Sequence, residues 1–433
     1  MCSDQSRACY NPWYVLSTIW GEHNDVIDDR THDRNRSTWN GLVGAAYTPE
    51  KRKKFATEYK INLSEIEPLS PAERDSVERR LKTRLGSGAM LPDLLKTPNF
   101  RNLHFWRPYS VEGFVFPAGA DFSGSKFDFC FRGSAFFVGW LGFHNCDFQE
   151  VLFRKPASLY GRTEFTESKF YKAAKFIELE AKEAADLVFA SCNFFDKFDL
   201  SLILAPKSSI YLDGSVFHDH VTIESNRIGV NFSMSEVTFK RFFPQLSGNK
   251  IIGGLELPYD AHKFPSFSKE DAEYVSNFYF KCADMMRKRS RHRESVFFRN
   301  QALDSRKYFG GGLSRLFFTG YGLLSRYGSS VKRPLLYLLV VIVLPVPIYF
   351  MHFAPACISI MRDFSNICAP IFFDAVLNSF LISLLSLAFV RELLGLTPHL
   401  ELPPPVSYVS VIQSLVSVVL LMLLVDALNR LRL

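Results

Sequence analysis

The sequence predicts a mainly β solenoid, preceded by a helical region and followed by a helical neck and transmembrane helices. Three observations lead to this fold class. A six-residue apolar pattern recurs through the middle of the chain with a period just above twenty residues, a basic stretch follows it, and the last quarter is apolar. The chain has 433 residues and 47% hydrophobic content, enough for two or three domains. The expected regions are a cap at 1–98, the solenoid at 99–265, a basic amphipathic neck with an interfacial segment at 266–332, and a transmembrane module at 333–433.

A helix is predicted inside the N-terminal region. Ser70 suits the N-cap position, Pro71 the first helical position and Glu73 the third, so we expect a helix from Pro71 to Leu85. Solenoids need their open ends covered. Because this region directly precedes the repeats, we expect it to form an α-helical cap.

Each repeat unit consists of a large apolar residue, two spacers, a small or apolar residue, one spacer and a second large apolar residue. Successive units lie 20 to 24 residues apart. Eight segments match: Phe100–Phe105, Phe122–Phe127, Phe143–Phe148, Phe165–Phe170, Phe189–Phe194, Leu212–Phe217, Phe232–Val237 and Ile252–Leu257.

Five-residue steps with a period near twenty favour a square coil with five residues on each side. Stacked coils of this kind bury a continuous core that no single coil could bury. An ordinary antiparallel β domain is the alternative, but hairpin signals are scarce, with Asp213-Gly214 the main exception. The expected inward residues are Phe105, Phe122, Phe127, Phe143, Phe148, Phe165, Phe170, Phe189, Phe194, Phe217 and Phe232, and the expected small residues beside them are Ser125, Cys146, Ser168, Cys192, Ser215 and Ser235.

The net charge of +7 is concentrated in the neck. Between Lys281 and Arg333 there are thirteen Lys or Arg residues against three Asp or Glu residues. Basic residues beside a membrane segment are attracted to anionic lipid headgroups. Nucleic-acid binding is the rival interpretation, and the position next to an apolar segment disfavours it. An amphipathic segment after Gly310–Gly312 is expected to lie in the membrane interface, and the candidate headgroup ligands are Arg315, Arg326, Lys332 and Arg333.

Two transmembrane spans are predicted, Leu335–Phe353 and Val406–Val425. Prolines 345 and 347 should kink the second half of the first span. Basic residues precede the first span and follow the second, so the positive-inside rule places both ends in the cytoplasm. Two full spans satisfy this rule and three do not. The middle apolar segment, Phe372–Val390, is therefore expected to be a re-entrant or interfacial helix.

The middle segment carries two polar residues, Asp374 and Asn378, which are the candidate pore-like residues. A carboxylate near a helix start favours the positive end of the helix dipole, which explains Asp374 structurally. A role in an ion pathway is the functional alternative.

The cysteines and the motif search argue against catalysis. The eight cysteines include no Cys-x-x-Cys pair, so we expect buried thiols in a reducing compartment rather than a disulfide framework or a zinc site. His218 and His220 would share one face of a strand but lack a third metal ligand. No nucleotide-binding, hydrolase or zinc-protease motif occurs in its required context. We expect no enzymatic activity, no cofactor and no metal.

The five-residue register resembles that of pentapeptide-repeat proteins, in a degenerate form centred on phenylalanine. That resemblance implies a right-handed quadrilateral β-helix. The whole layout is similar to a bacterial membrane-bound subgroup in which the repeats precede a two-span, ion-channel-like module. The matching segments are Pro12-Trp13-Tyr14, Gly21-Glu22, Asn35-Arg36, Trp39-Asn40-Gly41, Tyr327-Gly328, Arg333-Pro334-Leu335, Asp374-Ala375 and Asn429-Arg430. The stretch 391–405 has one glycine and nothing like a potassium-selectivity filter.

The expected function is that of a membrane-anchored protein of the bacterial inner membrane. Its solenoid and C-terminus would lie in the cytoplasm, where the solenoid would act in interaction or sensing. The expected partners are membrane lipids and an unidentified protein, and self-association stays open. Residues 100–260 contain 17 basic and 19 acidic residues, so the strongly acidic surface of a DNA mimic is not expected. The alternative is an ion-channel-like, pore-forming oligomer without a recognisable potassium filter.

Overall fold

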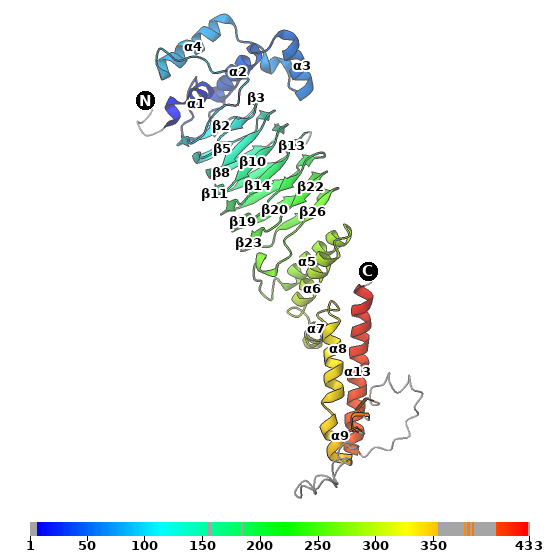
Figure 1. The fold of residues 1–433 in the computed structure, drawn as a ribbon. Helices are drawn as coiled ribbons and strands as arrows, with labels where there is room; N and C mark the ends of the chain where they lie inside the picture. The colour runs from blue at the N-terminus through cyan, green and yellow to red at the C-terminus, as the bar shows by residue number, and fades with distance from the viewer. Residues whose placement is uncertain are drawn as a thin grey trace, which may run out of the picture. The chain divides into compact units, whose positions relative to one another are not determined.

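The computed structural model describes residues 7–154, 157–182, 185–353 and 404–431, together with 376–377, 379–381 and 383–384 (Figure 1). The chain divides into two compact units, Met1–Ser266 and Phe267–Leu433. The first contains N-terminal helices and a β-solenoid, and the second contains helices, two of them apolar and long.

The N-terminal helices begin where the local sequence provides caps. The predicted helix over Pro71–Leu85 is confirmed, and Ser70 and Glu73 form the expected capping box. Asn11, Asp28 and Thr48 accept backbone N–H groups at three other helix starts. The elements are η1 (Arg7–Tyr10), α1 (Pro12–Ser17), α2 (Asp29–Ala45), α3 (Pro49–Tyr59), η2 (Leu63–Ile66) and α4 (Pro71–Leu85).

The solenoid consists of parallel strands stacked in four columns, over about six turns rather than the eight coils expected from the sequence (Figure 1). Column 1 contains β1 (His104–Phe105), β5 (Lys126–Arg132), β8 (Asp147–Arg154), β11 (Lys169–Phe170), β15 (Asn193–Phe194), β19 (Val216–Phe217) and β23 (Thr238–Phe239). Column 2 contains β2 (Tyr109–Ser110), β12 (Ala174–Ile177), β16 (Phe198–Ser201), β20 (Val221–Glu224) and β24 (Gln245–Ser247), joined by the second halves of β5 and β8.

Column 3 contains β3 (Val115–Phe116), β6 (Phe136–Phe137), β9 (Ser158–Leu159), β13 (Glu180–Ala181), β17 (Leu204–Ala205), β21 (Arg227–Ile228) and β25 (Lys250–Ile251). Column 4 contains β4 (Ala120–Asp121), β7 (Leu141–His144), β10 (Thr163–Thr166), β14 (Leu187–Ala190), β18 (Ile210–Tyr211), β22 (Asn231–Ser233) and β26 (Gly254–Glu256). A short helix, η3 (Ala261–Lys263), follows the last strand.

The core of the solenoid is built from stacked aromatic rings. All eleven phenylalanines expected to point inward are at most 2% exposed. Phe165 shows the arrangement, because its ring stacks between Phe143 at 4.6 Å and Phe189 at 5.0 Å. Equivalent side chains from successive turns thus form continuous columns inside the coil.

The predicted register is wrong in the last two units. Phe232 pairs with Ile210, not with Leu212, so Leu212 aligns with Met234. Correspondingly, Phe217 pairs with Phe239 rather than with Val237. Phe232 remains buried because it faces inward from column 4, whereas Ile252 is 61% exposed. The small position of this turn is occupied by Val237, not by Ser235.

A side-chain hydrogen-bond ladder explains why small polar residues recur beside the aromatic columns. The Ser168 hydroxyl donates to the Phe143 carbonyl at 2.8 Å and accepts the Cys146 N–H at 3.0 Å. Ser215 makes the same pair of contacts two turns later, with Phe189 and Cys192. The ladder satisfies backbone groups that the turn leaves outside the strand pairing.

The corner before each small residue adopts a left-handed backbone. The positive φ angles recur once per turn at Asn102, Gly124, Asn145, Glu167, Ser191, Gly214 and Glu236, with values from 50° to 74°. Glycine and asparagine adopt this conformation readily, while Glu167, Ser191 and Glu236 adopt it at an energetic cost. The recurrence includes Glu236, which independently supports the corrected register.

Burial controls the chemistry of the two ladder cysteines. It raises the pKa of the Cys146 and Cys192 thiols to about 12. Cys130 and Cys282 are also free thiols. Cys9, in contrast, is disulfide-bonded, so the expectation of eight reduced cysteines is wrong for this residue.

We expect a C146S/C192S variant to lose less stability than the wild type at alkaline pH. The folded pKa lies above the unfolded value of about 8.5, so the folded state retains a proton that the unfolded state loses. The thiol contribution is therefore complete below about pH 8.5 and falls as pH rises toward 12, by up to about 1.4 kcal/mol per pH unit for each thiol. Serine removes this dependence and retains the ladder. Urea unfolding between pH 7.5 and 10 measures it, and parallel wild-type and variant profiles would contradict it.

The N-terminal helices cover the first turn of the solenoid (Figure 1). The Trp39 indole N–H donates to the Val115 carbonyl at 2.9 Å. Asn40 donates to the Gly113 carbonyl at 3.0 Å and accepts the Val115 N–H at 2.9 Å. These contacts satisfy backbone groups of the first turn that have no preceding turn to pair with.

The regular secondary structure in the described part of the second unit is helical. The basic neck is broken in its arginine-rich stretch, because one helix ends at Arg287 and the next begins at His292. Another break separates two helices at Leu344-Pro345, where Pro345 and Pro347 are expected to kink the first span. The helices are α5 (Ala272–Arg287), α6 (His292–Ser305), α7 (Gly312–Ser325), α8 (Lys332–Val343), α9 (Val346–Phe353) and α13 (Pro404–Leu431).

A buried polar cluster joins the apolar helices. The Tyr349 hydroxyl donates to Gln413 Oε1 at 2.9 Å, and Gln413 Nε2 donates to the Ser383 carbonyl at 2.7 Å. Ser383 in turn donates to the Ile342 carbonyl. Hydrogen bonds between apolar helices stabilise their association, so this cluster connects α8, α9 and α13 to the described residues of the middle segment.

Candidate functional site

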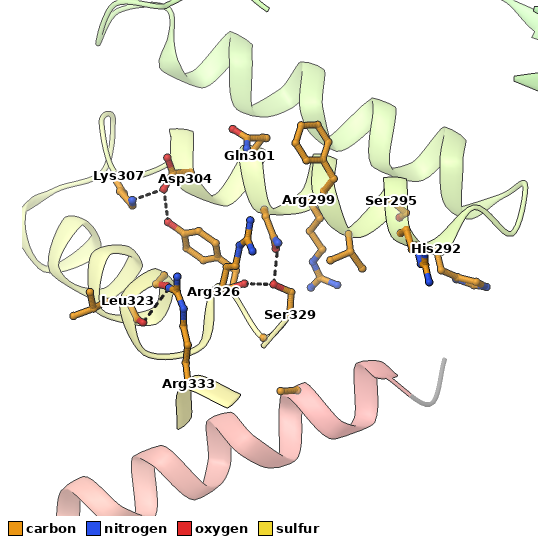
Figure 2. A pocket seen from close by; sticks show the side chains of 18 of the residues that line it. His292, Ser295, Arg299, Gln301, Asp304, Lys307, Leu323, Arg326, Ser329 and Arg333 are labelled. Carbon is orange, nitrogen blue, oxygen red and sulfur yellow. Dashed lines mark hydrogen bonds and ion pairs between the residues drawn. The ribbon is translucent and has the colours of Figure 1, made fainter. Parts of the chain in front are cut away.

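A basic pocket lies beside the ends of the apolar helices, within the second unit (Figure 2). It encloses about 1260 Å³ and is bounded by α6, the last part of α7, the turn that follows, the first part of α8 and Ala427 of α13. Two interhelical contacts define the wall formed by α6. The Ser276 hydroxyl donates to the Ala302 carbonyl at 3.0 Å, and the Ser295 hydroxyl donates to the Ala283 carbonyl at 2.9 Å. This pairing makes α6 antiparallel to α5 and directs one face of α6 toward α7.

Positive charge dominates the pocket. Its lining contains six cationic side chains and one carboxylate, that of Asp304. Among the described residues, no carboxylate lies within salt-bridge distance of Arg293, Arg326 or Arg333. The cationic residues are Arg287, Arg293, Arg299, Lys307, Arg326 and Arg333, and His292 lies at the rim.

The one carboxylate is already engaged. Asp304 forms an ion pair with Lys307 and accepts a hydrogen bond from the Tyr327 hydroxyl at 2.8 Å (Figure 2). Burial raises the pKa of Tyr327, and the hydrogen bond to Asp304 raises it further, so the phenol stays protonated and remains a donor. Asp304 therefore offsets little of the positive charge of the five arginines in the lining.

An unusual turn places Arg326 in the pocket. Arg326, Tyr327 and Gly328 all adopt left-handed backbone angles, with φ of 51°, 59° and 76°. Such angles cost energy at residues other than glycine. The turn is held by Ser329, whose hydroxyl donates to the Arg326 carbonyl at 2.7 Å, and by Asn300, which donates to Ser329 at 3.1 Å.

Arg333 connects the pocket to the first apolar helix. Its guanidinium donates to the Gly322 and Leu323 carbonyls at 3.2 and 3.3 Å, at the C-terminal end of α7. Carbonyls at a helix end lack intrahelical partners and carry partial negative charge, so a cation is favourable there. Arg333 thus holds α7 against α8 while contributing charge to the pocket.

The structure separates the four predicted headgroup ligands into two pairs. All four side chains are exposed, but Arg326 and Arg333 line the pocket, whereas Arg315 and Lys332 lie outside its lining. The pore-like candidates Asp374 and Asn378 lie outside the described residues. Sequence reasoning missed Arg293, Arg299 and Lys307 as site residues, although all three belong to the basic stretch that it identified.

The histidines considered as metal ligands lie on the outer face of the solenoid. His218 stacks on Phe195 at 4.8 Å, and His220 stacks on Phe242 at 3.7 Å. Within the described part of the chain, no group of three or more His, Cys, Asp or Glu residues is placed to hold a metal ion.

Comparison with protein-family models, curated proteins and solved structures found no match for this chain. The functional argument therefore depends on the geometry and charge described above.

Proposed function

We propose that the chain is a membrane-anchored repeat protein whose solenoid presents a surface for interaction or sensing. The observation that supports anchoring most directly is the exposure of apolar side chains on the two long helices. Lys332–Met351 and Ser407–Asn429 are long and apolar enough to cross a membrane, and only 22% and 17% of their most apolar windows are buried. Exposed apolar surface costs about 25 cal/mol per Å² in water, and a lipid environment removes this cost.

The finer features of the proposal follow from the repeat and from the charges beside the helices. We propose that the solenoid is a right-handed quadrilateral β-helix of the pentapeptide-repeat type, and its four strand columns support this. We also propose a bacterial inner membrane location with the solenoid and the C-terminus in the cytoplasm. The basic residues before the first apolar helix and after the second support this orientation.

The outer face of the solenoid offers a surface for a protein partner. Tyr171 and Phe195 are 40% and 41% exposed and stack on each other at 5.4 Å. His218 extends the same stack by one turn. Exposed aromatic side chains are enriched at protein interfaces, so this stack, residues 171, 195 and 218, supports an interaction role over catalysis.

Ion conduction is the alternative function expected from the sequence. The polar groups of Tyr349, Ser383 and Gln413 bond to one another or to backbone carbonyls inside the apolar helices. Helix packing therefore accounts for these groups. The described residues supply no observation that favours conduction over anchoring.

Membrane anchoring is tested by fractionation of the full-length chain. We expect the chain to sediment with membranes, to resist extraction by alkaline carbonate and to be released by detergent, because two apolar helices resist transfer to water. A matched variant with L336E/L339E/V343E on the exposed face of α8 should be released by carbonate to a greater extent. Recovery of the wild type in the detergent-free soluble fraction would contradict the proposal.

A further inference from the structure

We propose that the basic pocket binds a ligand that carries two phosphate groups. The position of the pocket favours the headgroup of an anionic phospholipid as that ligand. This inference deepens the proposed function, because the lipid source depends on membrane anchoring. The ligand chemistry itself depends only on the pocket.

The charge of the pocket requires an anion of more than one charge. Six cations line it against one carboxylate, and that carboxylate is held by Lys307 and Tyr327. Arg287 is paired with Asp284 outside the lining, which leaves Arg293, Arg326 and Arg333 as three cations with no carboxylate within salt-bridge distance among the described residues. Like charges gathered around one cavity repel one another, so a bound polyanion stabilises the arrangement. A single carboxylate ligand would leave most of this charge without compensation.

The donor type favours phosphate oxygens. Five of the six cations are arginines, whose planar guanidinium groups donate two parallel hydrogen bonds to phosphate or carboxylate oxygens. Asn300 adds a neutral amide to the lining, with one N–H donated to Ser329. A volume of about 1260 Å³ exceeds what one inorganic phosphate fills and accommodates a headgroup with two phosphates.

The position of the pocket favours a lipid. Arg333 follows the first residue of one apolar helix, and Ala427 lies two residues before the end of the other. Both ends are where an apolar helix leaves the hydrocarbon and meets the headgroup layer. Leu323 and Val296 add apolar surface to the lining, which suits a ligand with a polar head and an apolar tail.

The test uses native mass spectrometry of the full-length chain in neutral detergent. Cardiolipin, which carries two phosphodiesters, is one probe, and inorganic pyrophosphate is the other. The pocket variant is R299Q/R326Q. The charge-matched control is R315Q/K332Q, which removes two exposed cations of the same helices and their flanks without touching the pocket. The single variant R293Q tests the same wall if the double variant does not fold.

We expect the wild type to retain cardiolipin in preference to phosphatidylcholine. The pocket variant should lose at least about tenfold in cardiolipin affinity, because it loses direct charge-assisted hydrogen bonds to phosphate oxygens. R293Q should lose less, and the control, whose cations make no such bonds, should stay within about threefold. Pyrophosphate binding that the pocket variant abolishes would support a soluble phosphate ligand in the same site. Binding of neither probe, or an equal loss in the pocket and control variants, would overturn the proposal. Fractionation is independent of this result, because both variants retain the apolar helices.

Discussion

Replacing Phe165 with alanine should destabilise the first unit by about 3–5 kcal/mol, the range typical of a buried Phe-to-Ala change. Phe165 is fully buried in the middle of the solenoid. Its ring stacks on Phe143 and Phe189 and lies 5.4 Å from Phe176. Alanine leaves a cavity that the regular backbone ladder cannot close, and it interrupts the aromatic column between turns. Because each turn contacts only its neighbours, the defect should also broaden the unfolding transition.

Tryptophan fluorescence during urea unfolding measures this effect, since all five tryptophans lie between residues 13 and 140, in the first unit. The matched control is Phe195→Ala, because Phe195 belongs to the next turn but lies on the outer face, 41% exposed. We expect that variant to lose less than about 1 kcal/mol. Equal losses of unfolding free energy in the two variants would contradict the prediction, because the inward aromatic column would then contribute no more to stability than an exposed ring.

Periodicity predicted the inward phenylalanines because a five-residue register leaves one large side chain per side facing the axis. It failed at Phe232 for a physical reason. Phe232 and Met234 are alternate residues of one segment, and both are buried, so either one satisfies the apolar pattern. Strand pairing decides between them, since Ile210 aligns with Phe232. The left-handed corner that recurs once per turn also fixes the register. In this turn the corner residue is Glu236, which, unlike glycine or asparagine, does not signal a left-handed backbone in the sequence.

The pocket was only partly predictable. Arg326 and Arg333 could be identified because they flank an apolar segment in the sequence. Arg299 and Lys307 depend on how α6 packs against α5 and α7, which is settled by contacts such as Ser276 with Ala302. No local pattern specifies that pairing. Basic residues from separate helices therefore line one cavity. The composition of the basic stretch alone does not predict which of its residues do so.

Replacing Trp39 with alanine should detach the N-terminal helices from the first turn of the solenoid and cost about 3–5 kcal/mol. Trp39 is fully buried, and its ring lies 5.7 and 5.1 Å from Phe114 and Phe116. The change also leaves the Val115 carbonyl without its indole donor, and an unpaired buried carbonyl costs about 1–3 kcal/mol. Hydrogen exchange of residues 99–121 should accelerate, because these strands lose the cover that protects them.

Trp20→Ala is the matched control for this prediction. Trp20 lies in the turn after α1, where its indole N–H donates to Thr38 at 2.6 Å and its ring contacts the Arg34 and Arg80 guanidinium groups, all within the N-terminal region. That variant should weaken the helices locally and leave exchange in the first turn unchanged. Trp39→Phe, which retains an aromatic ring but no indole N–H, should fall between the wild type and Trp39→Ala. If Trp39→Ala leaves exchange at 99–121 unchanged, the first turn is stable without its cover and the N-terminal helices are not a cap. If exchange accelerates and the variant also aggregates through its uncovered strands, the cap is what keeps this end of the solenoid from pairing with other chains.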